Sequence, residues 1–175
     1  MLYRMLLATS FVAMILAGAP AHACITSVPV ELVDIEYADV VVVGRIDNYT
    51  IVRDPVARQM FADSNDLSPD RRKSLESESF MSDYSRFDVI VDEVLLGKAP
   101  QTLTVIWDNS TFSLPETMPS GPLLIALRGP FPSSGTILSS PESNFLTVLQ
   151  APCSAPFMFA TESDEANAIR NKLHR

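Results

Sequence analysis

The sequence predicts a mainly β domain folded as a five-stranded, OB-like closed barrel, with a short helix before the first strand and another helix at the C-terminus. Segments of strand character recur along the chain, and the connections between them are rich in Gly, Pro and Ser. One segment, Val40–Val43, is a run of β-branched residues that ends at Gly44. Five strands with a long, glycine-bent first strand fit such a barrel better than a seven-stranded immunoglobulin-like β-sandwich, the alternative fold.

The first half of the domain is expected to contain one helix, one strand and one long insertion. A short amphipathic helix is predicted just after Pro29, because Val30, Val33 and Tyr37 recur at helical spacing. The first strand is predicted from residue 39 to about residue 52, with a bulge or sharp bend at the glycine that follows the valine run. A polar loop insertion at about 54–80 comes next, with one or two helical turns around residues 56–61.

A β-hairpin is the clearest local prediction in the chain. Apolar and polar residues alternate from Tyr84 onward and again from residue 102 to Trp107, and the sequence Gly97–Pro100 lies between them as a turn. Trp107 shares one strand face with Leu103 and Val105, so it is interpreted as a core residue rather than a platform for a ligand.

The remaining strands are predicted from apolar runs, and the last helix is predicted from its capping residue. Residues 122–128 and 144–150 are apolar on both faces, as expected of strands in the middle of a covered or closed sheet. All the local connections are compatible with antiparallel pairing. After Cys153, either Thr161 or Ser163 is expected to cap a final helix.

Residues 1–23 have the pattern of a secretory signal peptide. Arg4 supplies a positive charge, residues 5–17 are mostly apolar, and Ala21-His22-Ala23 provides small residues at positions −3 and −1. Cleavage there would make Cys24 the first residue of a secreted or periplasmic protein, and lipidation of Cys24 is the alternative. The apolar stretch is too short to span a bilayer, and no later one is long enough, so no membrane insertion is expected after cleavage.

The remaining residues, 24–175, have the length of one domain with a substantial core. The full chain carries a net charge of −8, and loss of Arg4 makes the mature chain more acidic still. Such a charge repels phosphate backbones and anionic lipids, so nucleic acid is not an expected partner. The one basic run, residues 71–73, is flanked by acidic residues and is interpreted as a solvated loop.

The chain has two cysteines, Cys24 and Cys153, and they are expected to pair because exported proteins fold in an oxidising compartment. The alternative, two free thiols in a metal or redox site, lacks a CxxC motif and a nearby histidine. No intrinsic metal site and no cofactor is expected.

Few residues suit catalysis. Of the two histidines, His22 belongs to the leader and His174 is the penultimate residue, so Ser-His-Asp, Cys-His and His-rich zinc chemistry are not expected. Asp88, Asp92 and Glu93 would allow chemistry with carboxylates alone. Asp88 and Asp92, however, would lie about 13 Å apart along a strand that rises about 3.3 Å per residue. They are better interpreted as solvated strand charges, and we predict that the protein is not an enzyme.

The order and spacing of these features resemble a known family. Cys24 at the mature N-terminus and the short helix lead into the segment Tyr37–Gly44, and the segments Phe87–Val91 and Leu95–Lys98 follow. Together they resemble the netrin-like modules of tissue inhibitors of metalloproteinases. The resemblance implies an OB-type barrel with packed helices and a disulfide-tethered N-terminus, here in a variant with a single possible disulfide.

The same resemblance implies a partner-binding site at Cys24, Ile25 and Thr26. In those inhibitors the amine and carbonyl of the N-terminal cysteine chelate the catalytic zinc of a protease, so Cys24 is the candidate ligand to a partner's zinc. This chain has Cys24-Ile25-Thr26 where the family has Cys-X-Cys, and Ile25 replaces a small hydroxyl residue. The function expected is a secreted or periplasmic, non-enzymatic protein-binding module, with inhibition of a zinc metalloprotease through Cys24 as its sharpest form.

Two other functions remain open. The first is an envelope interaction or assembly domain that uses the barrel face or residues 54–79 and has no inhibitory activity. The second is a small hydrolase that works with carboxylates alone, which would require at least two acidic groups converging in a pocket.

Overall fold

The computed structural model describes residues 28–63, 68–70, 80, 82–108, 114–129 and 144–174. In chain order the elements are the 3₁₀ helix η1 (Leu32–Tyr37), β1 (Val40–Val52), α1 (Pro55–Ala62), β2 (Tyr84–Leu96), β3 (Thr102–Asp108), β4 (Leu123–Arg128), β5 (Leu146–Val148), β6 (Met158–Ala160) and α3 (Asp164–Leu173). No helix in these ranges is both long enough and apolar enough to cross a membrane.

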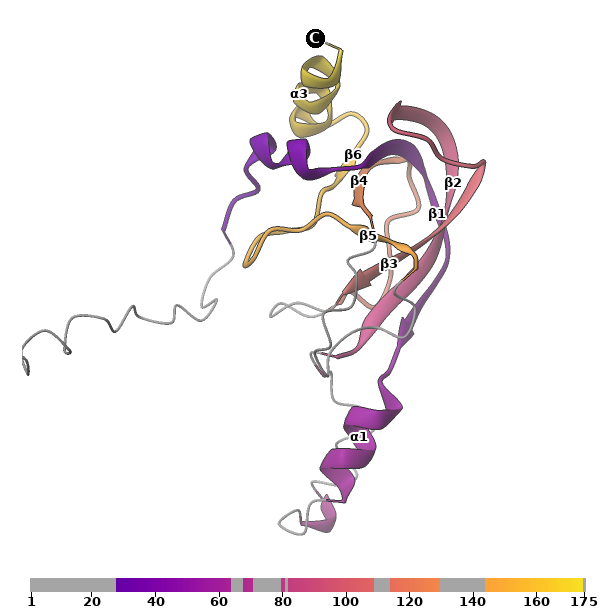
Figure 1. Ribbon diagram of the computed structural model, residues 1–175, viewed down its shortest axis with the longest axis vertical. Helices are drawn as coiled ribbons and strands as arrows, with labels where there is room; N and C mark the ends of the chain where they lie inside the picture. Colours follow the sequence, from indigo (N-terminus) through magenta and orange to yellow (C-terminus); the bar gives the residue numbers. More distant parts are fainter. Residues whose placement is uncertain are drawn as a thin grey trace, which may run out of the picture.

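Five strands close into a barrel, as the sequence predicts (Figure 1). The strand order is β1-β2-β3-β5-β4, and an additional pairing of β1 with β4 completes the circle. This closed arrangement is consistent with an OB-like barrel and differs from the two separate sheets of the sandwich alternative.

Two details of the sheet were not predicted. The local pairs β1–β2, β2–β3 and β4–β5 are antiparallel, as expected, but β3 and β5, which are not consecutive in the chain, pair in parallel. A parallel pair needs a long crossover connection, and the segment between β3 and β5, which includes β4, provides one. The short strand β6 was not predicted, and it pairs with β4 at the edge of the barrel. Its three residues are too few to show strand periodicity.

Gly44 produces the predicted irregularity in β1. The register between β1 and β2 shifts between Val43 and Gly44. A Cβ atom at Gly44 would lie 2.4 Å from the carbonyl oxygen of Ile90, so only glycine lets the two strands approach this closely. The predicted hairpin turn is also present, and Gly97 adopts a positive φ of 77° at its start.

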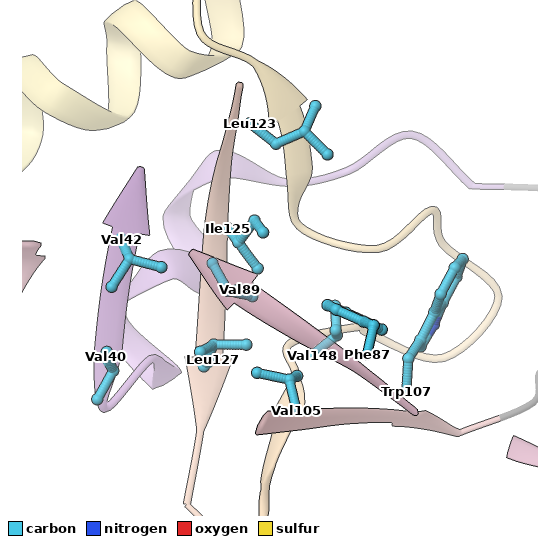
Figure 2. Packing of buried hydrophobic residues seen from close by; sticks show 10 residues of the cluster. All are labelled: Val40, Val42, Phe87, Val89, Val105, Trp107, Leu123, Ile125, Leu127 and Val148. Atoms are coloured by element: carbon cyan, nitrogen blue, oxygen red, sulfur yellow. The ribbon is translucent and has the colours of Figure 1, made fainter. Parts of the chain in front are cut away.

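The valine run of β1 is buried on both faces. Val40 and Val42 join the cluster inside the barrel, together with Phe87, Trp107 and residues from β4 and β5 (Figure 2). Val41 and Val43 belong to a second cluster outside the barrel, which η1 and α3 cover. A strand with two buried faces is apolar at every position, which explains why this segment does not alternate.

Helix α3 covers the second cluster and is capped as predicted. The hydroxyl of Ser163 accepts a hydrogen bond from the backbone N–H of Ala166 at 3.1 Å. Two basic side chains near its C-terminal end make ion pairs, Arg170 with Glu93 of β2 at 2.8 Å and Lys172 with Glu36 of η1 at 2.7 Å. The helix therefore holds η1 against the barrel.

The prediction for the first helix was wrong about which of its residues face the core. The element is a 3₁₀ helix, which repeats every three residues. At that spacing Leu32, Ile35 and Ala38 face the second cluster. Val33 and Tyr37, which were predicted to share the apolar face with Val30, are instead 52% and 72% exposed.

Candidate functional site

The predicted partner-binding residues Cys24, Ile25 and Thr26 lie outside the described residues. The structure does describe the chain that follows them, from Val28 onward, and Cys153 at the other end of the domain. These two segments meet. The backbone N–H of Val28 donates to the carbonyl oxygen of Cys153 at 2.8 Å, and Val28 forms an isolated parallel β-bridge with Ser154.

Cys153 is the one cysteine among the described residues, and none of these residues is a free cysteine. Its backbone lies in the left-handed region, with φ of 63°, which is uncommon for a residue other than glycine. Cys24 is the other cysteine of the sequence and lies outside the described ranges, so the pairing of Cys24 with Cys153 stays a prediction.

Residues 150–154, which we call the anchor loop, are fixed by hydrogen bonds of their own. The side-chain amide of Gln150 donates to the carbonyl oxygen of Ser154 at 2.6 Å. The backbone N–H and the hydroxyl of Ser154 both bond to the carbonyl of Ala151, at 3.1 and 3.0 Å. Ser154 is buried, so these bonds are shielded from competition with water.

The anchor loop is also tied to the inside of the barrel. The indole N–H of Trp107 donates to the side-chain oxygen of Gln150 at 2.8 Å. The Trp107 side chain itself packs with Phe87 and Val148 in the interior cluster, which confirms its predicted role in the core (Figure 2). The segment that begins at Val28, next to the predicted N-terminal site, is therefore bonded to the anchor loop, and Trp107 of the core holds that loop in place.

Loss of this indole hydrogen bond should loosen the anchor loop. We expect a double-mutant cycle of Trp107→Phe and Gln150→Leu to give a coupling free energy of about 1 kcal/mol, typical of a neutral hydrogen bond. Urea unfolding of the four proteins measures it. Hydrogen exchange at the Val28 amide should also be faster in Trp107→Phe. Additive effects and unchanged exchange would show that the bond does not position the loop.

The acidic residues of β2 do not converge. Asp88 accepts hydrogen bonds from the side-chain amide of Asn48 at 2.9 Å and from the hydroxyl of Thr104 at 2.7 Å. These two bonds hold the pKa of Asp88 below its ordinary value, because they stabilise the ionised form. An ionised carboxylate at neutral pH is not poised to act as a general acid.

The other two carboxylates point to different neighbours. Asp92 pairs with Arg45 of β1 at 3.0 Å, and Glu93 pairs with Arg170 of α3 at 2.8 Å. Within the described part of the chain, no group of three or more His, Cys, Asp or Glu side chains could hold a metal ion. This geometry favours the interpretation of these residues as strand charges.

A buried ion pair at the base of the insertion could not be seen in the sequence. Two guanidinium nitrogens of Arg58 in α1 donate to the two carboxylate oxygens of Asp83 at 2.6 and 2.9 Å. The backbone N–H groups of Asp54 and Phe80 also donate to Asp83, each at 2.9 Å. The guanidinium of Arg58 lies 4.6 Å from the centre of the Phe80 ring. These contacts fix α1 to the start of β2.

Comparisons of the chain with protein-family models, curated proteins and solved structures find no match.

Proposed function

We propose that this chain is an exported, non-enzymatic protein-binding module that presents its mature N-terminus, beginning at Cys24, to a protein partner. The hydrogen bond from the Val28 N–H to the Cys153 carbonyl carries the proposal. Val28 is four positions after Cys24, and four residue steps of extended chain span at most about 14 Å. The anchor loop thus limits where the N-terminus can lie, and a disulfide between Cys24 and Cys153 would limit it further.

The sharpest form of the proposal is inhibition of a zinc metalloprotease. The free α-amine of Cys24 has an ordinary pKa of about 8, so part of it is neutral at pH 7 and can bind a metal. Its amine and carbonyl would chelate the zinc of the partner, and Ile25 and Thr26 would lie beside it in the complex. A fixed N-terminus loses little conformational entropy on binding, which favours affinity.

A single added residue tests this form. We expect mature protein that begins at Cys24 to inhibit one or more zinc endopeptidases in a panel that includes thermolysin. The same protein with one alanine before Cys24 should inhibit at least about 100-fold less, because the amine is then an amide. The matched control carries one alanine after Arg175. Equal inhibition by both extended proteins would contradict zinc binding through Cys24, and no inhibition by any of them would exclude the inhibitory form.

Export itself is tested by analysis of the secreted material. We expect intact mass and N-terminal sequencing to show a chain that begins at Cys24, two mass units lighter than the dithiol form and without lipid. Protein that begins elsewhere would remove the basis of the proposal.

A second candidate function is an interaction or assembly domain of the cell envelope that binds through the insertion. Val56, Met60 and Phe61 of α1 are large apolar side chains, each more than half exposed. This function predicts that the alanine extension leaves binding intact, whereas the double substitution Val56→Ser and Met60→Ser abolishes it.

A further inference from the structure

We propose that the exposed face of η1 is a docking surface for a basic protein segment with an apolar side chain at its centre. The face consists of the exposed residues Glu31, Val33, Glu36 and Tyr37 of η1 and its N-cap. The helix η1 lies beside α3, at the end of the molecule opposite α1 (Figure 1). This inference rests on the proposed function, because it names the chemistry of the partner that reaches the mature N-terminus. The surface itself can be tested separately.

Large apolar side chains are concentrated in this part of the chain. Val33 and Tyr37 are both more exposed than buried, and Val28, which leads into η1, is nearly half exposed. Among the residues that the structure describes, eight large apolar side chains are exposed, and these three lie within the first ten positions. Tyrosine is enriched at the energetic centres of protein interfaces, so Tyr37 is the expected centre of the surface.

The exposed side chains stand on a fixed base. Ile35, on the opposite side of η1, is 1% exposed and packs in the second cluster with Ala166 and Ile169 of α3. The ammonium group of Lys172 reaches back to η1, where it pairs with Glu36 and lies 3.5 Å from the carbonyl oxygen of Val33. A surface that is already ordered loses little entropy when a partner binds.

The charge around this face determines the kind of partner. Residues 28–44 contain four acidic residues and no lysine or arginine. Glu31, Asp34 and Glu36 belong to η1 and its N-cap, whereas Asp39 follows the helix and its carboxylate accepts a hydrogen bond from the backbone N–H of Gly129. At this face Lys172 pairs with Glu36. The remaining negative charge attracts a basic segment and repels an acidic one. Exposed apolar side chains beside acidic ones therefore match Lys or Arg residues that flank an apolar side chain.

The test uses two synthetic peptides of equal length, one alternating Arg and Leu and the other alternating Glu and Leu. The protein begins at Cys24 and is labelled with ¹⁵N for NMR titration. We expect the basic peptide to shift the amide resonances of residues 31–38 with a Kd below about 1 mM, and the acidic peptide to leave them in place. Binding should weaken as salt is added, because the attraction is partly between exposed charges.

Matched variants locate the site. The double substitution Val33→Ser and Tyr37→Ser should weaken binding of the basic peptide at least about tenfold, whereas Val56→Ser with Met60→Ser on α1 should not. Glu31→Gln with Asp34→Asn should reduce both the affinity and its salt dependence. Equal binding of both peptides, shifts confined to other elements, or no binding at all would overturn the inference.

Two further outcomes separate this inference from its rivals and from the proposed function. Concentration-dependent dimerisation that is lost in the Tyr37 variant would show that the face binds a second copy of the chain, and would overturn the assignment to a basic partner. The protein with an alanine before Cys24 should still bind the basic peptide, since its η1 is unchanged. Failure of protease inhibition with peptide binding intact would thus reject the N-terminal site and retain the η1 surface.

Discussion

Replacing Asp83 with alanine should destabilise the protein by about 3 kcal/mol, since breaking a buried ion pair leaves an uncompensated charge. Asp83 is 3% exposed, and its partner Arg58 is also largely buried. The substitution removes two hydrogen bonds to Arg58 and leaves the N–H groups of Asp54 and Phe80 without their acceptor. Urea unfolding monitored by tryptophan fluorescence measures the loss.

The surface pair of Arg45 and Asp92 provides the control. Both side chains are more than one third exposed, so Asp92→Asn should change stability by less than about 1 kcal/mol. A similar loss in the two variants would show that burial does not strengthen the Arg58–Asp83 pair.

The carboxylate of Asp83 should also make the stability of the protein fall at acid pH. Burial alone would raise the pKa of Asp83, but the hydrogen bonds from Arg58 and from two backbone N–H groups outweigh it and hold the pKa below its ordinary value. A lowered pKa in the folded state gives stability that is fully present above the unfolded pKa of about 3.9 and is lost as the pH falls through the folded value. Asp83→Asn should lack this part of the acid destabilisation, as unfolding curves between about pH 5 and pH 2 would show.

The barrel could be predicted because its strands carry strong local signals. The alternation from Tyr84 and the two-sided apolar run at Val40–Val43 both follow from where the side chains are buried. The parallel β3–β5 pair could not be predicted, because the direction of pairing between non-consecutive strands depends on a long connection and leaves no local pattern. The phase of η1 was missed because six residues fit a period of 3.6 almost as well as a period of 3.0.

The candidate site was less accessible to sequence reasoning. Compartment and cysteine count point to Cys24 and Cys153, but nothing local indicates that Trp107 bonds to Gln150, 43 residues later. Arg58 lies in a polar insertion where charges are common, and Asp83 follows that insertion, 25 residues later. Such pairs form because the barrel brings distant segments together, so their partners become evident only once the strands are placed.

Gly44→Ala should be among the most damaging single substitutions in this chain. The new Cβ would lie 2.4 Å from the carbonyl oxygen of Ile90 and 2.8 Å from a methyl carbon of Val89. Gly44 also pairs with β2 on one side and with Leu123 of β4 on the other, so a shift of β1 away from Ile90 disturbs both ladders. We expect a loss of about 3 kcal/mol and a fall in Tm of about 10 °C.

Gly121→Ala is the matched control, because a Cβ at Gly121 would have no atom within 4 Å. We expect it to change stability by less than about 0.5 kcal/mol, as at other open surface positions. Differential scanning calorimetry of the two variants compares a glycine required by close strand approach with one that is not. If Gly44→Ala unfolds at the same temperature as Gly121→Ala, β1 and β2 do not approach this closely, and the closure of the barrel through β1 would need another explanation.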